Sequence, residues 1–298
     1  MHRLAAGIPP VKTLEESVGR VRLAEKLGYE SVWTYQLPGT RDASLVLAAY
    51  AAKTERIKLA TGVLPIYTRH PTAMVQMAAT LDELSGGRFI LGIGVSHRVT
   101  VESMWGLQLH RPVEAMREYL TIVRTSLREG ACNFDGDFFT AHWAYSGPRR
   151  VDLSVMISAL NPRMLELAGE LADGVVLYMC PPRYIQDEVI PAVRKGREKA
   201  GKTLDGFEIV AAVDACVTPD RDAALDVYKG TLERYASLPF YRRAMEAGGF
   251  NADELAAIGD AKLVRAAIAR YREAGVTLPA IGPFGGRFEA TLEGAAES

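Results

Sequence analysis

The sequence has little cysteine, and the few cysteines it has are widely spaced. Only Cys132, Cys180 and Cys216 occur among 298 residues, and no two of them have the CxxC spacing of a metal or redox motif. An odd number of cysteines at such separations also argues against a disulfide framework. We therefore expect a reducing, cytoplasmic environment.

An excess of one charge and long apolar runs are also lacking. The 35 Lys and Arg residues against 36 Asp and Glu residues give a formal net charge of −1. Without clustered positive charge, we expect neither nucleic acid nor an anionic membrane surface as a partner. The longest apolar stretch, residues 43–52, has about half the length of a membrane-spanning helix. The sequence therefore predicts no membrane segment and a small molecule as the substrate.

Short β-branched runs alternate with longer helical stretches along the chain. Each run is mostly continuous in hydrophobicity, as strands buried on both faces require. The eight predicted strands span residues 3–8, 31–35, 57–64, 88–94, 154–159, 174–178, 207–217 and 276–281. A strand followed by a helix, repeated in this way, predicts an α/β fold of the (β/α)8 or TIM barrel class. A doubly wound open sheet is the alternative, but no GxGxxG follows the first strand.

Predicted helices follow the strands. Thr13 and Glu16 form a capping box before the first helix, and His70 with Pro71 is expected to fix the start of the third. The predicted helices cover residues 13–28, 43–53, 72–84, 112–128, 163–172, 183–200, 221–235 and 262–274. Because a barrel takes about 250 residues, we expect a single domain over residues 1–298 with insertions near 130–150 and 236–259. In the first insertion, Asp135-Gly136 predicts a hairpin turn.

Several catalytic groups are missing from the ends of the predicted strands, where a barrel carries its chemistry. No lysine lies there, which disfavours a Schiff-base enzyme, and no close carboxylate pair, which disfavours a glycosidase. The histidines form no HxH pair, so we predict no metal site. Asp214, inside the seventh strand, is interpreted as a buried, hydrogen-bonded structural carboxylate. A barrel mouth rich in glycine and poor in ionisable groups suits a cofactor that brings its own chemistry.

A set of motifs in a fixed order points to a family. TERI (54–57), TGV (61–63), RHP (69–71), TLDELSGGRF (80–89) and LGIGVS (91–96) follow one another. This set resembles the bacterial luciferase-like superfamily, most of all its F420-dependent oxidoreductases, a branch that includes methylenetetrahydromethanopterin reductase. The resemblance implies a barrel that binds the deazaflavin F420, or else FMN, at its carboxyl-terminal mouth. It also implies a homodimer, for which the apolar helices over 43–53 and 71–84 are the candidate interface.

The same resemblance assigns three strand ends to the cofactor. In similar proteins, a non-proline cis peptide bulges at the end of the third strand and backs the cofactor ring. The fourth strand end is expected to supply backbone donors and a hydroxyl, and the helix after the fifth is expected to hold the phosphate. The matching residues are Gly62, Val63 and Leu64, then Gly94, Val95 and Ser96, then Ser158, Ala159, Leu160, Asn161 and Arg163.

The chain departs from the family after the second strand. Many relatives carry an Asp-His or similar pair there, whereas this chain has Gln36-Leu37. Gln36 can hydrogen-bond a ligand but cannot act as a general acid. His97, which follows the strand-end glycines, is the predicted substitute, and its alternative interpretation is a loop histidine bonded to backbone. The catalytic candidates are therefore His97, Tyr35 and Gln36.

Three functional hypotheses remain open at this point. The first is an F420-dependent oxidoreductase that transfers a hydride between F420 and an unidentified small organic substrate. The second keeps the fold and makes the protein an FMN-dependent luciferase-like monooxygenase. The third is a non-catalytic flavin-binding barrel, which would be consistent with the missing Asp-His pair.

Overall fold

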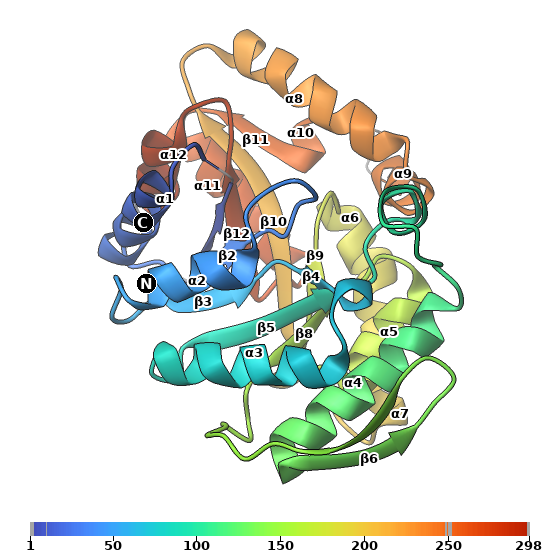
Figure 1. Cartoon of the computed structure of the whole chain (residues 1–298). Helices are drawn as coiled ribbons and strands as arrows, with labels where there is room; N and C mark the ends of the chain where they lie inside the picture. The colour runs from blue at the N-terminus through green and yellow to red at the C-terminus, as the bar shows by residue number, and fades with distance from the viewer. Residues whose placement is uncertain (1–2, 10, 248, 250–251, 297–298) are drawn as a thin grey trace.

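A closed ring of parallel strands forms the centre of the computed structural model, which describes residues 3–9, 11–247, 249 and 252–296 (Figure 1). Each strand pairs with the next, β9 pairs with β10, and β12 returns to β1. The ring strands are β1 (Ala5–Ile8), β2 (Ser31–Thr34), β3 (Lys58–Thr61), β5 (Phe89–Gly94), β8 (Val155–Ser158), β9 (Gly174–Leu177), β10 (Glu208–Val217) and β12 (Leu278–Pro283). This arrangement confirms the predicted (β/α)8 barrel.

Helices surround the ring, close to their predicted positions. The main ones are α1 (Leu14–Lys26), α2 (Ala43–Ala51), α3 (Pro71–Leu84), α4 (Pro112–Glu129), α5 (Pro162–Leu171), α7 (Ile190–Lys199), α8 (Arg221–Ala236) and α11 (Ala261–Glu273). The predicted helix over 183–200 is divided into α6 (Pro182–Tyr184), the π-helix η3 (Ile185–Val189) and α7. A further helix, α12 (Phe288–Ala296), packs against α1 and was not predicted.

Local signals set two of the helix starts as expected. The Thr13 hydroxyl accepts a hydrogen bond from the Glu16 backbone N–H at 3.1 Å, which confirms the capping side chain of α1. The His70 ring accepts from the Thr72 backbone N–H at 3.4 Å and so caps α3. Two short helical segments, η1 (Ile66–Thr68) and the π-helix η2 (Val99–Met104), lie in the loops after the third and fourth ring strands.

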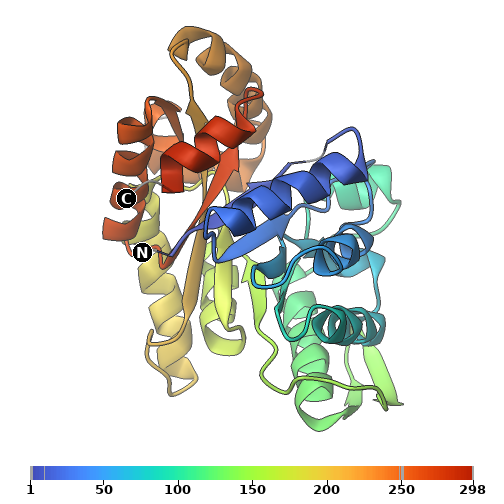
Figure 2. The ribbon, with the colours of Figure 1, turned by 90° about the vertical axis from the view of Figure 1, so that its left-hand side faces the viewer.

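Both predicted insertions are present as added structure. The strands β6 (Ala131–Asp135) and β7 (Thr140–Ala144) form the expected antiparallel hairpin, which packs on α4 through Ile122, Cys132 and Ala141. The second insertion contains α9 (Pro239–Ala247), α10 (Ala252–Leu255) and β11 (Ala256–Gly259), and β11 pairs with β10 outside the ring. Figures 1 and 2 place the hairpin and α8 at opposite ends of the molecule. That the chain forms a single domain stays a prediction.

One predicted strand, over residues 57–64, is interrupted. The ring strand β3 ends at Thr61, and β4 (Leu64–Pro65) continues the pairing with β5 beyond the interruption. Between them the Gly62 backbone N–H makes a last bond to the Thr34 carbonyl at 2.9 Å, and the Gly62–Val63 peptide bond is cis. The cis bond expected from the family resemblance is thus confirmed, and beyond it the chain keeps its pairing with β5 and leaves β2.

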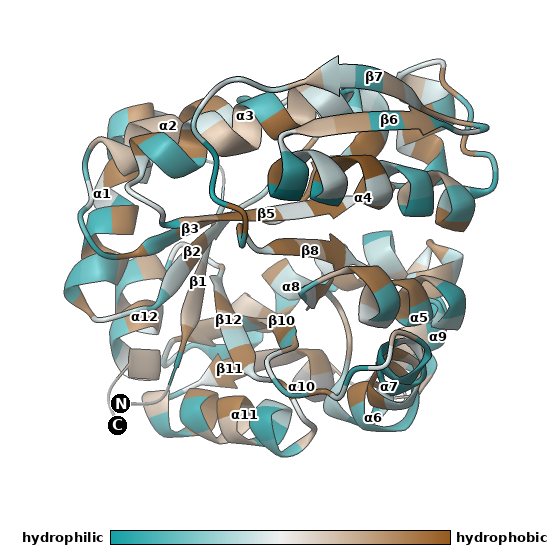
Figure 3. Cartoon of the chain, turned by 90° about the horizontal axis from the view of Figure 1, so that it is seen from below, coloured by the Kyte–Doolittle hydropathy of each residue, from teal (hydrophilic) through white to brown (hydrophobic). Residues whose placement is uncertain are grey.

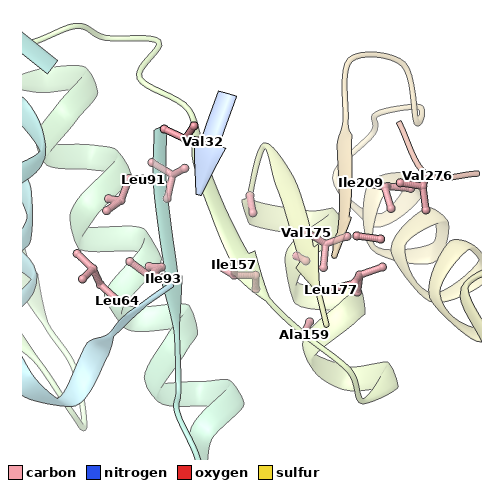
Figure 4. Packing of buried hydrophobic residues seen from close by; sticks show 14 of the residues in the cluster. Val32, Leu64, Leu91, Ile93, Ile157, Ala159, Val175, Leu177, Ile209 and Val276 are labelled. Carbon is pink, nitrogen blue, oxygen red and sulfur yellow. The ribbon is translucent and has the colours of Figure 1, made fainter. Parts of the chain in front are cut away.

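Two hydrophobic clusters lie on opposite sides of the strands. The larger fills the space between strands and helices, and Figure 4 shows part of it, with Leu91, Ile157 and Val175 on successive ring strands. Figure 3 shows the strands largely brown, whereas teal gathers on the outer helices. The smaller cluster lies inside the ring and consists of Ala5, Trp33, Ala60, Ile90, Met156, Val210, Leu278 and Ala280. Among the described residues, no helix has the length and apolar character that crossing a membrane requires.

Candidate active site

The side chains that face the barrel mouth follow from the inner cluster. Because side chains alternate along a strand, every second residue beyond an inner-cluster member points into the ring. By this rule, the residues that face the mouth are mainly glycines and residues with polar side chains. The glycines are Gly7, Gly62, Gly92, Gly94 and Gly282, and the polar residues are Tyr35, Ser158, Tyr178 and Asp214.

The mouth is hollow. On β10, the inward residues Ala212 and Asp214 keep partial exposure, although the outward residues between and beside them are buried. The same holds for Ser158, Val176 and Gly282 on three other strands. A barrel interior is normally filled by its side chains. The partial exposure of these inward residues indicates a shallow depression at the carboxyl ends of the strands, although Gly7, Gly92 and Gly94 themselves are buried.

Three of the predicted cofactor residues meet in this depression. A Cβ atom built on Gly94 would lie 2.4 Å from the Ser158 Oγ and 2.7 Å from the Val63 Cγ2. Such distances are shorter than real contacts, so only glycine at position 94 lets the Val63 and Ser158 side chains approach. The ends of β3, β5 and β8, predicted separately from sequence motifs, thus form one surface.

Tyr35, a predicted catalytic residue, lies across the mouth. Its hydroxyl oxygen is 1.9 Å from the point where a Gly7 Cβ would stand, and its ring is 3.4 Å from that of Gly62. Two strand-end glycines therefore make room for this side chain. Burial, together with the nearby Asp214 charge, raises the pKa of Tyr35 well above its ordinary value. Tyr35 is a neutral hydroxyl at physiological pH.

Gln36 and His97, the other catalytic candidates, lie beside the mouth. The Gln36 side-chain oxygen accepts a hydrogen bond from the Ala43 backbone N–H at 2.8 Å, at the start of α2. The His97 ring packs edge-on against Tyr235 of α8 and Tyr241 of α9, with centroids 6.4 and 5.6 Å away. Burial lowers the pKa of His97. His97 is therefore held by the second insertion, and its proton-transfer role stays a prediction.

The predicted phosphate site at the start of α5 is only partly available. Asn161 caps the helix by accepting from the Met164 N–H at 3.0 Å, and Pro162 has no N–H to offer. The Arg163 side chain is exposed and pairs with Glu114 at 2.8 Å. In the first turn of α5, the backbone N–H of Arg163 is therefore the group that can donate to an anion. The assignment of Asn161 and Arg163 to the cofactor phosphate stays a prediction.

The remaining predicted residues offer mainly backbone. The side chains of Leu64 and Ala159 are buried, and the Leu160 carbonyl accepts from the Tyr184 hydroxyl at 2.7 Å. Val95 packs against the larger cluster. Ser96 has φ 60°, in the left-handed region, which turns the chain sharply after β5. In the part of the chain that the structure describes, no group of three His, Cys, Asp or Glu residues is arranged to hold a metal ion.

The expectation of a mouth poor in ionisable groups is wrong at Asp214. Its Oδ2 accepts from the Tyr178 hydroxyl at 3.2 Å and from the Tyr228 hydroxyl at 3.0 Å, so it is hydrogen-bonded as expected, although the residue is only half-buried. However, it points into the ring, which the strand prediction alone did not show. The signal was present in the sequence, because Val210, Ala212 and Asp214 share one face of the strand.

Comparisons with known proteins give one family. The protein-family model described as luciferase-like monooxygenase matches residues 1–278. The 5,10-methylenetetrahydromethanopterin reductase of Archaeoglobus fulgidus is 36% identical over 206 residues, or 68% of this chain. The chain spans 61% of that relative's length.

Two solved structures share the fold. A coenzyme F420 dependent tetrahydromethanopterin reductase from Methanopyrus kandleri matches with a TM-score of 0.83 and 24% identity, over 99% of this chain and 97% of that one. An F420-dependent secondary alcohol dehydrogenase matches with a TM-score of 0.82 and 20% identity, over 95% and 93%. At these identities, the likeness establishes the fold.

Proposed function

The chain belongs to the luciferase-like family, as its motifs indicated, and from this premise we propose that it is an F420-dependent oxidoreductase. In this proposal, a hydride passes between F420 and a small organic substrate. The relatives' names support F420, whereas the family's description as monooxygenase supports the alternative, an FMN-dependent monooxygenase.

The close packing of the ends of β3, β5 and β8 at Val63, Gly94 and Ser158 is the observation that carries the proposal. A flat ring system needs a surface without long protruding side chains. Gly62 and Val63 are partly exposed there, whereas Gly94 is buried under the Val63 and Ser158 side chains. The contacts among Val63, Gly94 and Ser158 leave no space for a side chain at position 94. The residues present therefore fit a deazaflavin or flavin ring.

Two polar groups that lack partners follow the Gly62–Val63 bulge in the chain. The Tyr67 hydroxyl and the Arg69 Nη1 are buried, and neither has a hydrogen-bond partner in the described part of the chain. The other terminal nitrogen of Arg69 donates to Asp42 at 2.7 Å, which fixes the guanidinium after the bulge. Buried polar atoms are normally satisfied. These two groups are thus available to a bound molecule with acceptor atoms.

Each part of the chain has a separate task in this proposal. Gly62, Val63 and Gly94 would hold the ring, with the Ser158 hydroxyl beside it and the Arg163 backbone N–H toward the phosphate. When bound, F420 supplies or accepts a hydride. Tyr35 would exclude water from the mouth and present a neutral hydroxyl, and a proton-transfer role for His97 stays a prediction.

Cofactor titration tests the proposal. Purified protein is titrated with F420, and the quenching of F420 fluorescence is followed, with FMN in a parallel series. We expect saturable low-micromolar binding of F420 and no retention of FMN. The protein is then assayed for F420 reduction with a panel of alcohols and sugar phosphates, and for F420 oxidation with unsaturated carbonyl compounds.

The alternatives give different results in the same assays. Retention of FMN alone would refute the F420 proposal and favour the monooxygenase. Cofactor binding without turnover over the whole panel would favour the non-catalytic barrel.

We also propose a cytoplasmic homodimer. The neighbouring helices α2 and α3 expose Leu45 and Leu84, at 73% and 51%, on the face away from the ring. The three cysteines are free and buried, which is compatible with a reducing environment. Sedimentation equilibrium of the protein and of Leu45→Glu measures the association, and a wild-type monomer would refute it.

A further inference from the structure

A half-buried acid and four tyrosines lie together where β9, β10, α8 and α9 meet. Asp214 accepts from the hydroxyls of Tyr178 and Tyr228. The Tyr178 ring contacts the Tyr235 ring edge-on at a centroid distance of 4.9 Å, and Tyr235 contacts Tyr241 at the same distance. We call Asp214, Tyr178 and Tyr228 the acid–tyrosine cluster.

The surroundings of Asp214 differ from those of the structural carboxylates in this chain. Asp82 is paired with Arg150 at 2.9 Å, and Asp173 is paired with Arg124 at 2.7 Å. Asp214 receives hydrogen bonds from two neutral hydroxyls, and no cationic side chain of the described residues forms an ion pair with it. Buried charges are normally paired with an opposite charge, so the partners of Asp214 set it apart from these two carboxylates.

The mouth leaves room for the other carboxyl oxygen of Asp214. Gly282 is its register partner on β12, and a Cβ on Gly282 would lie 2.6 Å from the Asp214 Oδ1. Asp214 is also partly exposed within a strand whose outward residues are buried. The carboxyl group therefore has access to the depression in which the ligand is proposed to bind.

We propose that Asp214 takes up and releases the proton that accompanies hydride transfer, and that the Tyr178 hydroxyl passes this proton to and from the substrate. The inference rests on the proposed function and names its substrate class, a carbonyl or imine compound or the corresponding alcohol or amine. Tyr178 is the residue in contact with the substrate, and Asp214 acts through it.

The proton step balances as follows in the direction of reduction. With reduced F420 bound, the hydride that it would supply would form a C–H bond at the substrate carbon, and the π electron pair would move to the oxygen or nitrogen. That atom takes the proton of the Tyr178 hydroxyl, which in turn takes the proton of the Asp214 carboxyl. Asp214 is left as a carboxylate and regains a proton from water. Oxidation of an alcohol or amine runs the same path in reverse.

The ionisation of Asp214 agrees with this use. Burial raises the pKa of Asp214 to about 6, while the hydrogen bonds from Tyr228 and Tyr178 act in the opposite direction. The titratable groups that face it are Tyr178 after β9, Tyr228 and Tyr235 on α8 and Tyr35 after β2. β11 and β12 face it with Ala256 and Gly282, which do not titrate. His97 is separated from Tyr178 by the Tyr235 ring.

The first test uses the protein without cofactor. Infrared spectra of protein labelled with 13C-aspartate, recorded between pH 4 and 9, should show a protonated carboxyl band that disappears around pH 6. Asp214→Asn should remove this band, and Asp82→Asn, a buried but arginine-paired control, should retain it. In Tyr228→Phe, the band should persist to higher pH, because one donor to the carboxylate is lost. A band absent at pH 5, or unchanged in Asp214→Asn, would overturn the inference.

The second test adds F420 and the alcohols and carbonyl compounds of the panel. Asp214→Asn should bind F420 with wild-type affinity, lose about 10² to 10³-fold in turnover and lose the pH inflection near 6. Tyr178→Phe should lose turnover similarly, and His97→Gln should retain the inflection. Wild-type turnover and pH profile in Asp214→Asn would overturn the inference while leaving the F420 proposal intact. If the protein shows the titrating band but does not bind F420, the proposed function is refuted, whereas the proton exchange at Asp214 stands.

Discussion

The contact among Gly94, Val63 and Ser158 makes a quantitative prediction about one methyl group. In Gly94→Ala, the new Cβ lies 2.4 Å from the Ser158 Oγ, whereas the Ser158 Cβ is 3.6 Å away, an ordinary contact. Relief requires a shift of about 1 Å at Ser158 or Val63, and forced overpacking of this kind costs about 1–3 kcal/mol. We therefore expect Tm to fall by a few degrees to about ten.

A second substitution tests the cause. Ser158→Ala removes the crowded oxygen, so the double variant should recover part of the loss, with a coupling of about 0.5–2 kcal/mol between the two positions. The recovery is partial because the Val63 Cγ2 stays 2.7 Å from the new Cβ. F420 affinity should fall on the order of tenfold in Gly94→Ala, which corresponds to about 1.4 kcal/mol.

Gly19→Ala is the matched control. It places the same methyl group on α1, where no atom lies within 4 Å, and we expect a gain of about 0.5–1 kcal/mol in stability and unchanged F420 affinity. Urea unfolding and F420 fluorescence titration measure both quantities. If Gly94→Ala behaves like Gly19→Ala, or if the two losses at positions 94 and 158 simply add, the packing of the mouth described above is wrong.

Three further predictions concern the scaffold. Arg150→Met leaves the Asp82 carboxylate, 5% exposed, without its partner and should cost about 3–5 kcal/mol in urea unfolding, most of it recovered by adding Asp82→Leu. Arg3 and Lys58 lower the pKa of Glu30 to about 2, below its unfolded value, so this stabilisation is present above pH 4.5 and is lost as pH falls toward 2. Glu30→Gln should be less stable than wild type at pH 6 by about 1–3 kcal/mol. On acidification, the Tm of Glu30→Gln should fall less than the Tm of the wild type. Parallel curves of Tm against pH for the two proteins would contradict this. Gly196→Ala places a Cβ 1.9 Å from the Glu166 carbonyl oxygen and should lower Tm by several degrees, whereas Gly230→Ala, with open space around it, should not.

Sequence reasoning succeeded wherever the signal was local or periodic. The eight strands, the α1 cap at Thr13 and the hairpin at Asp135-Gly136 follow from hydrophobic periodicity and from short-range hydrogen bonding, which neighbouring residues determine among themselves. The family motifs likewise indicated the cis bond at Gly62–Val63. Elements that depend on distant contacts were missed, such as β11, which exists only because β10 offers it an edge.

The candidate site shows the same difference between local signals and contacts of residues distant in the chain. The sequence by itself determined the barrel, the family and the strand ends that form the mouth, because these depend on periodicity and motif order. Only the tertiary structure decided which side chains meet: Ser158 and Val63 at Gly94, and Asp214 with Tyr178 and Tyr228. These residues are 14 to 95 positions apart in the chain, and closing the strands into a ring brings them together. The direction in which Asp214 points therefore became clear only when the ring showed which face of β10 lies inside.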